Sequence, residues 1–141
     1  LVEAPQTCEV SFGRTAQIYD MRGREYIGET EKNLVTLGPG DTAMFAVLPY
    51  EVTGVQITGD DPDLRATVQA ADDPTDHVFH VTVTDPEGNP APAYTRNILA
   101  PGGSAELRIP LALNDPMGQW TVTVRDVLSG VEASASFDWQ P

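Results

Sequence analysis

Residues that cross-link or anchor a protein are scarce in this sequence. Cys8 is the only cysteine among 141 residues, so no disulfide can form within the chain and cysteine content identifies neither an oxidising nor a reducing compartment. No apolar run approaches the roughly 20 residues of a membrane span, so membrane insertion is not expected. The chain also begins without Met, which indicates a mature or trimmed fragment and is compatible with a signal peptide upstream.

Basic side chains are scarce as well. Eight Lys and Arg residues stand against 21 Asp and Glu, which gives a formal charge of −13, and Lys32 is the only lysine. Residues 51–141 carry 4 basic and 14 acidic side chains. Nucleic acids and anionic lipid surfaces are bound through Lys and Arg. The composition therefore excludes nucleic acid as an expected partner.

Helical periodicity is missing, and apolar residues alternate with polar ones instead. Trp120, Val122 and Val124 share one face of a predicted strand, and Phe137 and Trp139 share one face of the next. This pattern predicts an all-β chain. The strands expected are residues 7–12, 17–20, 25–28, 33–37, 43–48, 64–70, 78–84, 105–109, 119–126 and 131–139, and residues 52–57 are expected to lead into the second module.

Turn-forming clusters separate these strands at intervals of about ten residues in the second part of the chain. Residues 85–90, 100–103, 114–118 and 128–130 combine Pro, Gly, Asn, Asp and Ser. This spacing favours an immunoglobulin-like antiparallel β-sandwich over residues 51–141, preceded by a short β-rich segment over residues 1–50. Residues 29–32 are expected to form a turn. Residues 43–48 are apolar throughout, which predicts a strand covered on both faces.

The inventory for nucleophilic catalysis is small. A triad needs Ser or Cys, a His base and a carboxylate. His77 and His80 are three apart in one predicted strand and are therefore expected on opposite faces. The simpler interpretation is two surface or loop histidines and, in Cys8, a small core thiol. We therefore expect no catalytic residue in this chain.

Two acidic loops raise a calcium hypothesis, because calcium binds several carboxylate and carbonyl oxygens of a loop. Neither loop matches the twelve-residue calcium loop, so solvated turn residues are the competing interpretation. No other cofactor is expected. The candidate ligands are Asp60, Asp61 and Asp63 in one loop and Asp72, Asp73 and Asp76 in the other.

Aromatic rings are the candidates for carbohydrate contact. Trp120 and Trp139 fall on the inner faces of their predicted strands, which favours core packing over sugar stacking. Tyr94 follows the run Pro-Ala-Pro-Ala and is the residue whose contact with a ligand we would test first.

Two stretches resemble modules of large secreted bacterial proteins. Residues 16–28 and 35–50 contain a Tyr-Asp-x-Arg hairpin and a Leu-x-Pro-Gly-Asp turn, and they resemble the closing β-domain of large bacterial glycoside hydrolases. Residues 109–126 contain Gly-x-Trp-x-Val and resemble the last hairpin of immunoglobulin-like modules. Neither pattern carries catalytic residues.

The resemblance implies a soluble, non-catalytic accessory region downstream of an enzyme domain. Its expected partners are other domains of the same protein, and its expected location is secreted, periplasmic or on the bacterial cell surface. Two alternatives stay open: a carbohydrate-binding module, and an adhesion-type surface domain stiffened by calcium.

Overall fold

The computed structural model describes residues 4–60 and 64–140, which form antiparallel β-sheets in two compact units. The first unit contains residues 4–51 and 128–130. The second contains residues 52–60, 64–127 and 131–140. The all-β class expected from the sequence is confirmed.

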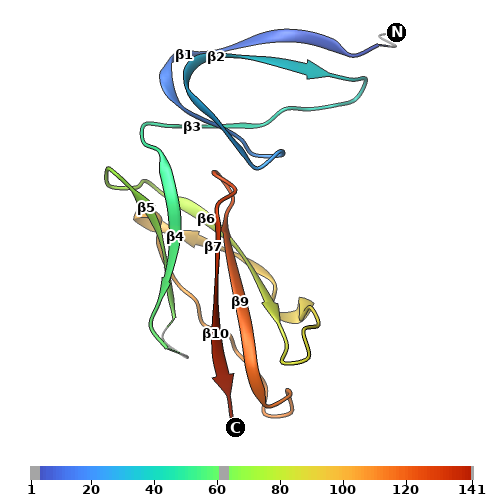
Figure 1. Ribbon diagram of the computed structural model, residues 1–141, viewed down its shortest axis with the longest axis vertical. Helices are drawn as coiled ribbons and strands as arrows, with labels where there is room; N and C mark the ends of the chain where they lie inside the picture. The colour runs from blue at the N-terminus through green and yellow to red at the C-terminus, as the bar shows by residue number, and fades with distance from the viewer. Residues whose placement is uncertain (1–3, 61–63, 141) are drawn as a thin grey trace. The chain divides into compact units, whose positions relative to one another are not determined.

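The first unit is a three-stranded sheet in the order β2-β1-β3 (Figure 1). Its strands are β1 (Gln6–Asp20), β2 (Glu25–Leu37) and β3 (Phe45–Leu48). The short strand β3 pairs with only the last four residues of β1. The buried side chains of the three strands gather at that end of the sheet and are Ala16, Ile18, Tyr19, Ala46 and Leu48.

The β1–β2 hairpin is longer than the sequence predicts. Four short strands were expected, with a turn at residues 29–32, but that turn is wrong because these residues lie inside β2, where Glu29, Thr30 and Lys32 pair with β1. Most side chains of this two-stranded β1–β2 ribbon are exposed. Charged residues can therefore interrupt the alternation of apolar and polar side chains without ending the strand. The Lys32 ammonium lies 2.8 Å from the Glu9 carboxylate across the ribbon.

Side-chain and backbone geometry explains the two turns of the first unit. The Asp20 carboxylate accepts hydrogen bonds of 2.9 Å from the backbone N–H groups of Arg22 and Gly23, and so closes the β1–β2 turn. The turn before β3 has Pro followed by Gly40 at φ 81°, as a type II turn requires. The backbone N–H of Asp41 closes it by donating to the Gly38 carbonyl at 3.1 Å.

Strand β3 is covered on one face, not on both as predicted. Ala46 and Leu48 are buried, whereas Phe45 and Val47 alternate with them and are half-buried. Met44, in the same apolar run, is 55% exposed and precedes the strand. A continuous apolar run therefore does not indicate, in this strand, that both faces are covered.

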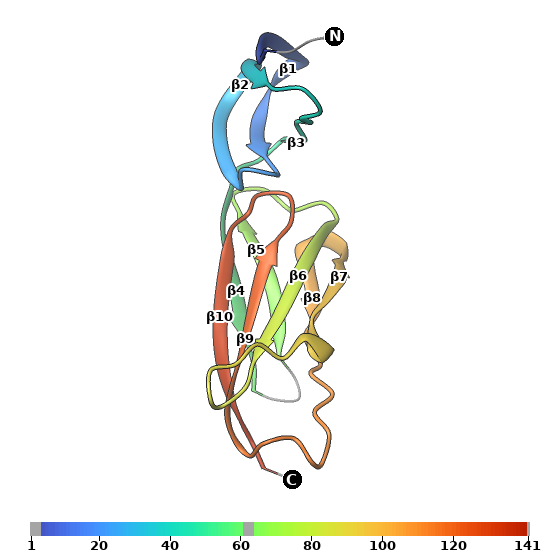
Figure 2. The same cartoon turned by 90° about the vertical axis from the view of Figure 1, so that its right-hand side faces the viewer.

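The second unit contains two antiparallel sheets, of orders β10-β9-β6-β7 and β4-β5-β8 (Figure 2). The four-stranded sheet consists of β6 (His77–Thr84), β7 (Arg96–Ala100), β9 (Gly118–Asp126) and β10 (Glu132–Trp139). The three-stranded sheet consists of β4 (Val52–Thr58), β5 (Arg65–Ala70) and β8 (Ser104–Glu106).

Alternating side chains supply the core of the second unit, as the sequence predicts. Along β6 and β9, buried and half-buried residues alternate without interruption over most of each strand. Buried apolar side chains of the four-stranded sheet include Phe79, Val81, Val83, Trp120, Val122, Val124 and Phe137, and those of the three-stranded sheet are Val52, Val55, Ala66, Val68 and Ala105. Since both sheets contribute to this list, the core is shared between them.

Two segments differ from the prediction. The sequence indicated no strand at residues 96–100, where β7 forms the edge of the larger sheet. The strand expected at residues 105–109 is shorter, since β8 ends at Glu106. Leu107 and Ile109 are nevertheless buried, and the Leu107 N–H donates to the Leu64 carbonyl at 2.8 Å. The chain therefore continues to bury apolar side chains after the strand pairing of β8 has ended.

Within residues 4–60 and 64–140 the helical elements are two 3-10 turns, η1 (Pro92–Tyr94) and η2 (Pro101–Gly103). In the described part of the chain no helix has the length and apolarity of a membrane span.

Gly103 is a position where a side chain is excluded. Its φ is +74°, and a Cβ there would lie 2.7 Å from the Pro74 Cβ. Gly103→Ala is expected to destabilise the fold by about 2–4 kcal/mol, since left-handed strain and overpacking add. Gly102→Ala is the matched control, because Gly102 has φ +57° with its nearest neighbour at 4.0 Å. Urea unfolding measures both, and equal losses would contradict the steric explanation.

Candidate functional site

The second unit contains a buried histidine–aspartate pair. His77 opens β6 and Asp126 closes β9, and their side chains are both 0% exposed. The His77 Nδ1 lies 2.8 Å from the Asp126 Oδ1. Asp126 is paired with Phe79 in the β6–β9 register, so His77 and Asp126 extend from the same face of the sheet.

The expectation of a surface or loop position for His77 is wrong. The alternation of β6 places its side chain inward, on the same face as Phe79 and Val81. A buried imidazole needs a hydrogen-bond partner, and the neighbouring strand supplies one in Asp126. The signal in the sequence was weak, because Asp126 ends the predicted strand 119–126 at an inward position and His77 directly precedes the predicted strand 78–84.

A carboxylate on His Nδ1 is the arrangement that orients a general base in hydrolases. A general base also has to reach the proton it removes, directly or through one water. Because His77 and Asp126 have no solvent exposure, the pair as it stands is suited to holding β6 and β9 together.

His80 lies on the opposite face of β6, as predicted. It is half-buried, and its Nδ1 lies 2.8 Å from the Asn97 Oδ1 on β7. Cys8 was expected in a core, and this is wrong, because it is exposed on the β1–β2 ribbon. The ribbon lies outside the buried end of the first unit, so alternation there does not produce burial.

Tyr94, in η1, is hydrogen-bonded to the loop that precedes β9. Its hydroxyl donates to the Asp115 carboxylate, and this hydrogen bond, followed by burial, raises the pKa of Tyr94. The same carboxylate accepts the Ala112 N–H at 2.7 Å. The Tyr94 ring meets that of Trp120 edge to face at 6.0 Å. Its polar atom thus has a structural partner, and its role in ligand contact stays a prediction.

The two tryptophans occupy inward positions, as expected, but to different depths. Trp120 is 2% exposed, and its Nε1 donates to the Pro116 carbonyl at 2.9 Å. Trp139 is only half-buried at the end of β10. Within the described residues its Nε1 is a buried polar atom without a hydrogen-bond partner.

The predicted calcium ligands are only partly described. Asp61 and Asp63 lie outside the described residues, and Asp72 and Asp73 are exposed. Asp76 accepts a hydrogen bond of 3.0 Å from the Gly102 N–H, which is a structural role. In the chain as described, no three His, Cys, Asp or Glu side chains are grouped to hold a metal ion. Calcium binding stays a hypothesis.

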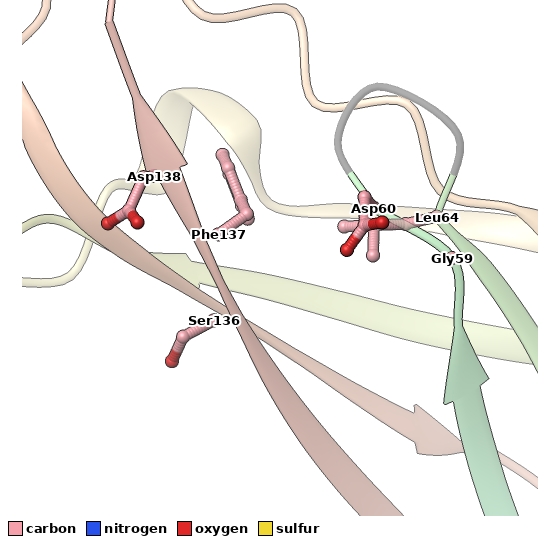
Figure 3. Close-up of a pocket in the computed structure, with 6 residues that line it drawn as sticks. All are labelled: Gly59, Asp60, Leu64, Ser136, Phe137 and Asp138. Atoms are coloured by element: carbon pink, nitrogen blue, oxygen red, sulfur yellow. The ribbon is translucent and has the colours of Figure 1, made fainter.

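A pocket of about 250 Å³ opens beside the end of β10 (Figure 3). Alternation places Phe137 toward the core and directs Ser136 and Asp138 to the other face of β10. Asp60 follows β4, in the other sheet. The lining residues are Gly59, Asp60, Leu64, Ser136, Phe137 and Asp138.

Asp85 organises the loop after β6. Its Oδ1 accepts the N–H of Glu87 at 2.9 Å and that of Asn89 at 2.8 Å. Hydrogen bonding, led by the Asn89 N–H, lowers the pKa of Asp85 from its ordinary 3.8. Because these bonds favour the charged carboxylate in the folded state, the ionised form stabilises the fold.

The lowered pKa predicts a pH-dependent effect of Asp85→Asn. The wild-type chain should be more stable than this variant above pH 3.8, and the difference should vanish as pH falls through the lowered pKa. Urea unfolding across this range measures it. Glu132→Gln, at an exposed position of β10, is the control for removing one charge. A difference that persists under strongly acidic conditions would contradict the assignment.

Comparison with known proteins adds no relative to this description: the chain matches no known protein family, no curated protein and no solved structure.

Proposed function

We propose that this chain is a non-catalytic accessory region of a larger secreted bacterial carbohydrate-active protein, where it supports domain packing or assembly. The observation that carries the proposal is that several side chains of the types used in catalysis or binding make hydrogen bonds that hold the fold together. His77 is bonded to Asp126 in the core, and the Tyr94 hydroxyl is bonded to Asp115. Asp20 and Asp85 accept backbone N–H groups in turns.

The strand order of the second unit supports an immunoglobulin-like sandwich as its fold. The first, second and fifth strands, β4, β5 and β8, form one sheet, and the last two, β9 and β10, join β6 in the other. Immunoglobulin-type domains divide their strands in this way. Strand β7 pairs with β6 in place of a position beside β8.

Local geometry in the first unit supports the resemblance to an accessory β-domain. The Tyr-Asp-x-Arg run forms the β1–β2 turn, where Asp20 caps the backbone and the Arg22 guanidinium donates to the Thr42 carbonyl at 2.8 Å. The Pro-Gly turn at residues 38–41 precedes β3. Both patterns form turns that connect strands, which is the kind of local structure that an accessory β-domain would use.

The full-length reading frame is the first test of this proposal. We expect it to encode a large enzyme domain upstream of this chain, with a secretion signal at its start. Sequencing the genomic locus or the transcript measures this directly. A reading frame that encodes this chain without a further large domain would contradict the proposal.

Carbohydrate binding by the chain itself is the competing function, and the half-buried ring of Tyr94 is the feature that favours it. Under the accessory role, polysaccharides in an electrophoresis gel should not retard the chain. Retardation that is lost in Tyr94→Ala but kept in Leu99→Ala would replace the accessory role with glycan binding, since Leu99 is 61% exposed elsewhere on the unit.

Thermal unfolding distinguishes the accessory role from the alternative of an adhesion-type domain stiffened by calcium. A ligand that binds only the folded state raises the melting temperature. A melting temperature that rises with calcium and falls with chelator would support the adhesion-type alternative, and Asp72→Asn combined with Asp73→Asn would then locate the effect.

A further inference from the structure

We draw no further inference here: the strongest candidate, the half-exposed apolar face of the β1–β2 ribbon around the exposed Cys8, carries nothing because nothing in the structure shows what covers it.

Discussion

Asp126→Ala is expected to lower the free energy of unfolding by about 3–5 kcal/mol, because it removes a buried hydrogen bond of His77 and leaves a cavity in the core. The remaining imidazole of His77 would be enclosed at 0% exposure without its carboxylate acceptor. Urea unfolding, followed by tryptophan fluorescence and circular dichroism, measures the loss. If the substitution changes stability alone, the midpoint urea concentration should fall while the dependence of the unfolding free energy on urea stays the same.

A double variant makes this prediction specific to the pair. His77→Phe combined with Asp126→Leu replaces both partners by apolar side chains and should recover much of the stability, since replacing both partners of a buried hydrogen bond by apolar groups of similar shape can be nearly neutral. Asn97→Ala is the matched control, since it removes the partner of His80 on the exposed side of the same strand. Its expected cost is below about 1 kcal/mol. Equal losses in Asp126→Ala and Asn97→Ala would contradict the structural role of the buried pair.

Trp120→Ala is expected to cost about 3–5 kcal/mol, the usual range for removing a large buried aromatic side chain. Trp120 is 2% exposed, contacts the Tyr94 ring and donates to the Pro116 carbonyl, so its removal opens a cavity and frees the loop before β9. Thermal and urea unfolding measure the change.

The loop before β9 also supplies the control for Trp120. Leu113 is 81% exposed, so Leu113→Ala should change stability by no more than about 0.5 kcal/mol. If Leu113→Ala destabilised the chain as much as Trp120→Ala, Leu113 would have to be a core residue and Trp120 would not stand out as one. Such a result would overturn the inward assignment of β9.

The strands that the sequence predicts best are those with one face on the core. In β6 every second side chain is buried, and the same holds for most of β9, while in β10 the alternation separates exposed side chains from half-buried or buried ones. The β1–β2 ribbon and the edge strand β7 were misjudged or missed for the opposite reason. Where a strand has no covered face, or only part of one, its side chains carry little alternation to recognise.

The site residues were less predictable because their roles depend on distant partners. The opposite faces of His77 and His80 follow from local parity, and this was predicted correctly. The burial of His77 depends on Asp126, which is 49 positions away and becomes its neighbour only through the β6–β9 register. Tyr94 likewise meets Asp115 across a loop, 21 positions along the chain.

The most direct test of the central claim compares the full-length protein with a version that lacks this chain. An accessory role predicts that the deletion lowers the melting temperature or secreted yield while kcat/KM of the remaining folded enzyme is unchanged. A deletion that abolishes turnover while the remaining protein keeps its melting temperature would contradict the account, because it would place essential chemistry within these residues.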